Sequence, residues 1–341
     1  MLYSILEIIS LVVLVFLFFK GGAPSTHCRF LSCEYTNCLR GIAILLVVLC
    51  HTADAFGTRI LTPLGGIGVA MFLFLSGYGL SESYKKYGLK CYWRKKLLRV
   101  FIPYFLLQSI SALYLQHFEI IPFILDITGI KSEYWYISYL LQWYIIFYVL
   151  YKITSSLSII LMAIISFLIL LFSSEIQAEQ AFSFLFGVLA SRYYTPINGF
   201  IAKKKGIIVL FFFLIGTSFL LIKQIPIIRE YRGTYIYNLM QCFIKLPLAF
   251  VLIISLAFVL IISLSYVTLI IKSRILLFFS LISYELYLVH MKFISMVDPN
   301  WKSIILFWVM SIFLSYLFYK YNSRISCSTF IKRCFFQNYY K

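Results

Sequence analysis

Long apolar runs separated by short polar segments recur along the whole chain. Most runs approach the roughly 20 residues that an α-helix needs to cross about 30 Å of hydrocarbon. They predict eleven membrane spans, at approximately residues 2–19, 39–57, 66–84, 98–115, 134–151, 157–173, 180–194, 206–222, 244–264, 275–292 and 302–320. The expected fold is therefore all-α: a polytopic transmembrane helical bundle with about ten core helices and one extra N-terminal span.

Charged residues between the runs predict the orientation of the helices. The segment 84–99 holds seven Lys and Arg residues and no carboxylate, as is typical of a cytoplasmic loop. The loop near 117–133 and the segment with Glu175 and Glu179 carry carboxylates and fit the outer side. The alternation places the C-terminus in the cytoplasm. Only the basic loop 223–232 breaks it, and this loop is interpreted as a contact for an anionic acceptor or for lipid headgroups.

The first run, 2–19, does not resemble a cleaved secretory signal, because a carboxylate stands near its start and a lysine follows it. We interpret it as a retained anchor with its N-terminus outside. The expected organisation is an N-terminal anchor and linker (1–37), a transmembrane domain (38–322) and a basic cytoplasmic tail (323–341).

The composition excludes a soluble globular protein. Of 341 residues, 62% are hydrophobic and 12% are charged, and the mean hydropathy is +0.94, whereas soluble domains carry about 25% charged residues. The net charge of +18 is interpreted as loop bias, so we expect the lipid bilayer and no nucleic acid among the partners. Frequent Ile, Phe, Tyr and Lys favour an AT-rich bacterial source and hence a bacterial inner membrane. The eight cysteines lack zinc-type spacing, and no metal site is predicted.

The stretch CLRGIAILLVVLCHTADAF, residues 38–56, places ionisable groups along an apolar run. Arg40 and His51 are eleven residues apart, so on a helix they share a face and lie about 16 Å apart along the axis. Asp54 follows one turn later on nearly the same face. Ionisable groups at this depth are costly and mark functional sites. Arg40 alone also fits an ordinary cytoplasmic flank, and Asp54 also fits the outer loop.

Six segments along the chain form an ordered set of motifs. They are LRGIAILLVVLCH, GGIGVAMFLFLSGYGLSESY, YWRKKLLRVFIPYF, SEYWYISYLLQWYIIFYVLY, FLFGVLASRY and ISYELYLVH. Together they resemble acyltransferase family three, the integral membrane O-acyltransferases of bacterial surface polysaccharides, and the resemblance runs from about residue 38 to 320. No single motif is specific, but six in this order are. Lys95 departs from the family pattern, which often has an Arg there in an R-x3-R pair with Arg99.

The resemblance implies an enzyme that moves an acyl group, most often acetyl, from cytoplasmic acyl-CoA to a hydroxyl group of a surface or lipid-linked polysaccharide. Acetyl-CoA would be a co-substrate, and no permanently bound cofactor is expected. Arg40, Lys95 and Arg99 are expected to bind the phosphates of coenzyme A. Arg40, which leads inward toward His51, is also expected to take part in catalysis.

In that reaction His51 would act as general base on a sugar hydroxyl, or would carry the acyl group as an acyl-imidazole. Asp54 or Glu285 would orient its imidazole ring. Three further residues are expected to line the acceptor end of the site: Trp135, Tyr284 and His290. The alternative for such aromatic residues is a role as anchors at the membrane interface.

Two other functions fit part of the pattern. A transporter or flippase for a lipid-linked glycan shares the spans, the basic faces and the intramembrane charges. The matched broken helices of many transporters are missing from the sequence, which favours the enzyme. A scaffold for glycan assembly explains the helices but not the alignment of Arg40 with His51.

Overall fold

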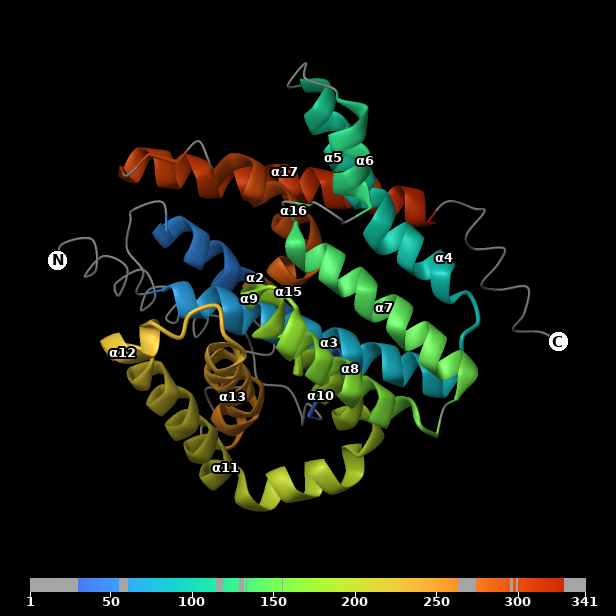
Figure 1. The fold of residues 1–341 in the computed structure, drawn as a ribbon. Helices are drawn as coiled ribbons and strands as arrows, with labels where there is room; N and C mark the ends of the chain where they lie inside the picture. Colours follow the sequence, from blue (N-terminus) through green and yellow to red (C-terminus); the bar gives the residue numbers. More distant parts are fainter. Residues whose placement is uncertain are drawn as a thin grey trace. The chain divides into compact units, whose positions relative to one another are not determined.

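In the computed structural model, the structure describes residues 30–54, 61–114, 119–128, 132, 134–154, 156–262, 274–294, 297–298 and 300–327 (Figure 1). These residues form helices joined by turns, and no strand occurs among them. The expected N-terminal span 2–19 and most of the expected tail 323–341 lie outside the described residues.

Each expected span from 39–57 onward overlaps at least one helix, although the span 275–292 is divided between two helices and α13 begins before the span 244–264. In chain order they are α2 (Cys33–Asp54), α3 (Thr62–Tyr87), α4 (Tyr92–Lys96), the π-helix η1 (Leu97–Phe101), α5 (Ile102–Tyr114), α6 (Ile120–Ile127), α7 (Trp135–Ile153), α8 (Ser158–Phe172), α9 (Glu175–Ala178), α10 (Ser183–Arg192), α11 (Tyr194–Ile222), α12 (Pro226–Arg229), α13 (Tyr235–Ile262), α15 (Arg274–Leu281), α16 (Ser283–Phe293) and α17 (Trp301–Cys327). The short helix α6 lies where the sequence predicts a loop.

Six of the described helices are long and apolar enough to cross a membrane. They are Cys33–Asp54, Thr62–Tyr87, Tyr92–Leu113, Tyr194–Ile222, Tyr235–Ile254 and Trp301–Arg324. A seventh span results if α15 and α16 are counted as one, although the pair bends by 76°. The all-helical membrane fold is therefore confirmed for the described residues, and the count of about ten spans stays a prediction.

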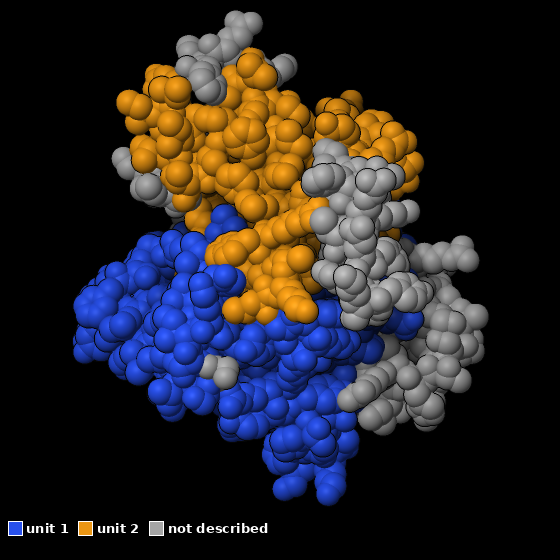
Figure 2. Space-filling model, turned by 90° about the vertical axis from the view of Figure 1, so that its right-hand side faces the viewer, with its two compact units in different colours: residues 1–88, 140–280 blue, residues 89–139, 281–341 orange. Residues whose placement is uncertain are grey.

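The chain divides into two compact units, coloured separately in Figure 2. Unit 1 comprises residues 1–88 and 140–280, and unit 2 comprises residues 89–139 and 281–341. Each unit is described by itself below.

Unit 1 is held together by close helix packing around α3, which contacts α2, α10 and α13. Glycines make the closest approaches possible. A methyl group on Gly77 of α3 would overlap the Phe184 carbonyl oxygen of α10, and one on Gly187 would overlap the Phe74 carbonyl oxygen of α3. In membranes, small residues let helix backbones approach in this way, and the gain is van der Waals contact.

In unit 2 the π-helix η1 follows from Pro103, which comes two residues after it. Proline has no N–H to bond the carbonyl four residues earlier, and its ring crowds that carbonyl. The Ile102 N–H bonds the Leu97 carbonyl, five residues back. The Val100 carbonyl accepts a hydrogen bond of 2.6 Å from the Tyr284 hydroxyl of α16. Two of the motifs, RVFIPYF and ISYELYLVH, are thereby joined.

We expect Tyr284→Phe to lower the stability of the solubilised protein by about 1 kcal/mol, since the Val100 carbonyl loses its side-chain donor. Thermal unfolding in detergent measures the effect as a lower Tm. Tyr321→Phe is the matched control, because Tyr321 in the same unit is 56% exposed. Equal midpoints for the two variants would show that the bond to Val100 contributes nothing.

Candidate functional site

Helix α2 places the predicted residues Arg40 and His51 on one continuous helix whose other positions are mostly buried. Both side chains are intermediate in exposure. The Arg40 Nη1 donates a hydrogen bond of 3.0 Å to Asn37 Oδ1, one turn earlier on α2. The helix is thus a buried scaffold with two ionisable groups that are still partly accessible.

The surroundings of Arg40 include the motif residue Ser76 of α3. The Tyr144 hydroxyl of α7 is hydrogen-bonded to the Ser76 side chain and lies within electrostatic range of Arg40. A methyl group added to Gly79 would lie 4.0 Å from Arg40 Nη2, at ordinary contact distance. The fold therefore brings Arg40, Ser76 and Tyr144 from three helices into one polar cluster.

The C-terminal end of α2 holds His51 beside Asp54, whose carboxylate acts on the imidazole electrostatically. Asp54 is exposed. Its Oδ1 accepts a hydrogen bond of 3.1 Å from Thr62 Oγ1, and its Oδ2 accepts one of 3.8 Å from Cys50 Sγ. Asp54 is thus fixed from its own helix and from the first turn of α3, one turn from His51.

The start of α3 fits closely against this end of α2. Pro63 occupies a first-turn position of α3, where its missing N–H is not needed. A methyl group on Gly65 would lie 2.7 Å from Cys50 Sγ, and one on Gly68 would lie 2.6 Å from the Ala43 carbonyl oxygen. The GGIG sequence therefore allows α3 to approach the residues beside His51.

The two cations expected to bind coenzyme A differ in their setting. Lys95 lies on α4 with intermediate exposure, and Arg99 lies on η1 and is exposed. Both belong to unit 2. Their role in donor binding stays a prediction.

The remaining predicted residues lie in unit 2. Glu285 is buried, and its Oε1 accepts a hydrogen bond of 3.3 Å from Asn322 Nδ2 of α17. His290 is fully buried, with its Nδ1 2.8 Å from the Leu286 carbonyl oxygen. Trp135 and Tyr284 are intermediate in exposure. The structure thus places Glu285 and His290 in a packed interior, and their parts in the reaction stay predictions.

Sequence reasoning assigned Lys85 only to loop bias, whereas the structure gives it a packing role in unit 1. Its Nζ lies 2.7 Å from Glu82 Oε1 and donates a hydrogen bond of 2.6 Å to the Ser191 carbonyl oxygen at the end of α10. Ser191 Oγ donates to the same Glu82 oxygen at 2.8 Å. This network joins the C-terminal ends of α3 and α10.

The basic loop 223–232, which breaks the charge alternation, is partly paired with carboxylates in unit 1. Arg232 Nε lies 3.3 Å from Glu175 Oε2. Burial and the neighbouring Lys245 ammonium lower the pKa of Lys223, while Glu179 and Glu175 act in the opposite direction. Part of the loop's charge is thus balanced within the protein.

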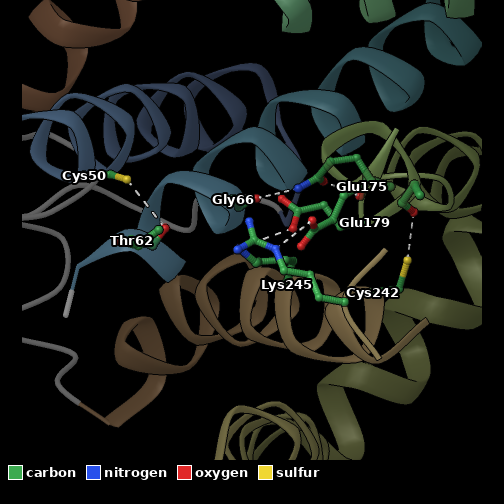
Figure 3. A network of polar contacts seen from close by, with 11 residues as sticks. Cys50, Thr62, Gly66, Glu175, Glu179, Cys242 and Lys245 are labelled. Carbon is green, nitrogen blue, oxygen red and sulfur yellow. Dashed lines mark hydrogen bonds and ion pairs between the residues drawn. The ribbon is translucent and has the colours of Figure 1, made fainter. Parts of the chain in front are cut away.

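A third ion pair in the described part of unit 1 was not predicted from the sequence. Lys245 of α13 lies 3.6 Å from Glu179, and their side chains are only 8% and 12% exposed. Figure 3 shows the two side chains directed toward each other near Gly66 of α3. The signal was present as polar residues at positions 238, 241 and 245, which share a face of α13.

These features define a helical membrane protein with ionisable groups on buried helices. The profile of the acyltransferase family 3 domain, described as an acyltransferase domain, matches residues 34–332. The chain therefore belongs to acyltransferase family 3 and is an acyltransferase. Comparison with curated proteins and with solved structures finds no significant match.

Proposed function

We propose that this acyltransferase moves an acyl group, acetyl in the simplest case, from cytoplasmic acyl-CoA to a hydroxyl group of a surface or lipid-linked polysaccharide. One observation carries the proposal: Arg40 and His51 lie on the same helix, α2. In the most apolar 18-residue segment of this helix, 78% is buried inside the protein. Ionisable groups on a buried membrane helix are costly and are retained for function. The proposed location is a bacterial inner membrane with the C-terminus in the cytoplasm.

In the proposed reaction His51 removes the proton from the acceptor hydroxyl. The hydroxyl oxygen attacks the thioester carbonyl, the C–O bond forms and the C–S bond breaks. The proton then passes from the imidazolium to the departing thiolate. If His51 instead attacks the thioester first, the C–S bond breaks, the thiolate leaves with the proton lost by the ring, and an acyl-imidazole forms. The acceptor hydroxyl group then forms the new C–O bond and displaces the imidazole, which takes up the hydroxyl proton. Asp54, fixed by Thr62 and Cys50, supports the positive charge on the imidazole in either route.

Arg40 supplies the donor side of the proposed site. Its guanidinium offers several donors in a planar fork that matches phosphate and carbonyl oxygens. The cluster with Ser76 and Tyr144 adds hydroxyl groups next to it. Lys95 and Arg99 are proposed to hold the phosphates of coenzyme A where the donor enters.

The proposal predicts that membranes containing the protein transfer radiolabel from [14C]acetyl-CoA to surface polymer. The polymer substrate is taken from a strain that lacks the gene for this protein. The NMR spectrum of that polymer should lack the ester signals seen in polymer from the parent strain. Membranes from that strain are the control. A flippase would move the polymer without any dependence on acetyl-CoA. If the protein brings polymer to the cell surface and that polymer carries neither label nor ester, acyl transfer to polysaccharide is refuted.

A further inference from the structure

A stripe of buried polar residues follows one face of α13. Asn238, Gln241 and Lys245 are spaced by three and four residues, which aligns them on a helix, and they are 5%, 4% and 6% exposed. Polar side chains are buried only at a cost unless they find partners. Such a stripe in an apolar helix therefore needs an explanation.

This stripe faces two other elements of unit 1. The Cys242 Sγ, next to Gln241, donates a hydrogen bond of 3.1 Å to the Ala178 carbonyl oxygen of α9. A methyl group on Gly66 would lie 2.5 Å from Lys245 Nζ, so the lysine lies directly against the first turn of α3. The Gln180 Nε2 donates a hydrogen bond of 2.9 Å to the Gly66 carbonyl oxygen. The turn after α9, the start of α3 and the stripe thus form one polar cluster. Figure 3 shows Lys245 of the stripe between Gly66 and Glu179.

Within the described part of the chain, the cluster holds two buried acceptor oxygens without a partner. Gln241 Oε1 and Asn238 Oδ1 are buried there without a hydrogen-bond partner. The Glu179 carboxyl group adds further acceptor oxygens to the cluster. Its separation of 3.6 Å from Lys245 exceeds the roughly 2.7–2.9 Å of a tight charge-assisted bond.

The cluster lies at the same end of unit 1 as His51. Lys245 is within electrostatic range of Cys50, the residue before His51. Cys50 also donates a hydrogen bond of 3.5 Å to the Thr62 carbonyl oxygen, at the start of the helix that carries Gly66. The polar cluster and the C-terminal end of α2 are therefore connected through α3.

We propose that Glu179, Lys245, Gln241 and Asn238 bind the hydroxyl groups of the acceptor. The two unpartnered amide oxygens accept hydrogen bonds, and the hydroxyl groups of a sugar can donate them. The Lys245 ammonium has further protons for a ring or hydroxyl oxygen. This inference rests on the proposed transfer to a polysaccharide.

Gln241→Leu tests the inference without a large change of side-chain volume. Replacing an unsatisfied buried amide by an apolar group should leave stability unchanged or raise it. If Gln241 binds the acceptor, the KM for ester-free polymer rises about fivefold, the equivalent of one lost hydrogen bond, while the KM for acetyl-CoA is unchanged. Asn238→Leu should act in the same direction. Ser166→Ala is the matched control, because Ser166 Oγ in α8 is also buried without a partner in the described residues.

A charge exchange separates recognition from packing at the ion pair. The double variant Glu179→Lys, Lys245→Glu restores the pairing, so it should accumulate better than either single variant. We expect its KM for polymer to stay raised, because the acceptor meets the opposite charges. A wild-type KM in the double variant, or in Gln241→Leu, would overturn the inference.

The two proposals fail in different ways. If the wild-type protein transfers no label to polymer, the proposed function itself is wrong. If it transfers label and Gln241→Leu keeps the wild-type KM for polymer, only the acceptor assignment is wrong. If the charge exchange prevents accumulation, Gln241→Leu decides the question alone.

Discussion

We expect His51→Ala to reduce the rate of acyl transfer by about 10²–10⁴-fold, the range that a general acid–base group contributes. The loss should appear in kcat, because the imidazole acts on the proton in the transition state and not on binding alone. Alanine is the best helix former, so α2 should remain intact and the protein should accumulate. Transfer of label from [14C]acetyl-CoA to polymer measures the rate, and quantitative immunodetection measures the protein.

His117→Ala serves as the control for this variant. His117 lies outside the described residues, in the loop that the sequence predicts outside the membrane. Asp54→Asn should cause a smaller loss than His51→Ala, since Asp54 supports the imidazole charge but does not take the proton. A His51→Ala protein that transfers label at a near-normal rate would remove the mechanism proposed above.

The second large effect is expected for Gly187→Ala, on folding. The added methyl group would overlap the Phe74 carbonyl oxygen. It would also lie 2.8 Å from the Phe74 carbonyl carbon and 2.9 Å from the Tyr78 backbone nitrogen. All three are backbone atoms, so α3 and α10 must separate. Overpacking of this kind costs about 1–3 kcal/mol or more, and we expect most of the variant to be lost from the membrane.

Gly199→Ala is the matched control for this substitution. Gly199 lies in α11, and a methyl group there would meet nothing within 4 Å. Alanine in place of an exposed helical glycine should raise stability by up to about 1 kcal/mol. Fluorescence-detected size exclusion after heating compares the two variants. If the Gly187→Ala variant had the same Tm as the Gly199→Ala variant, the close packing described for α3 and α10 would be contradicted.

Much of the helical pattern could be predicted from the sequence, because apolar runs report helices whatever their neighbours. The break between α15 and α16 could not. Ile282 leaves the helical conformation there without a proline or glycine nearby, so no local signal marks the bend. The sequence also predicted the span 244–264, whereas α13 begins at Tyr235.

That early start of α13 explains why the ion pair was missed. If the span began at residue 244, Lys245 would lie at its end, and its ammonium would be expected at the membrane–water interface. On the longer helix it lies ten residues beyond the start and faces Glu179. The alignment of Arg40 with His51 could be predicted because it depends on one helix alone, whereas Lys245 meets Glu179 only through tertiary packing.

The length of α10 has a consequence for how far the acyl group must travel. Ten residues at about 1.5 Å each cover about 15 Å, half the thickness of the hydrocarbon layer. With Arg192 at the inner boundary, Ser183 would stand near the bilayer midplane, and the irregular backbone before it would occupy the outer half. Such backbone is tolerated there only against protein or water. In the proposed reaction, a thioester held at this helix would approach the acceptor hydroxyl group across about half the bilayer.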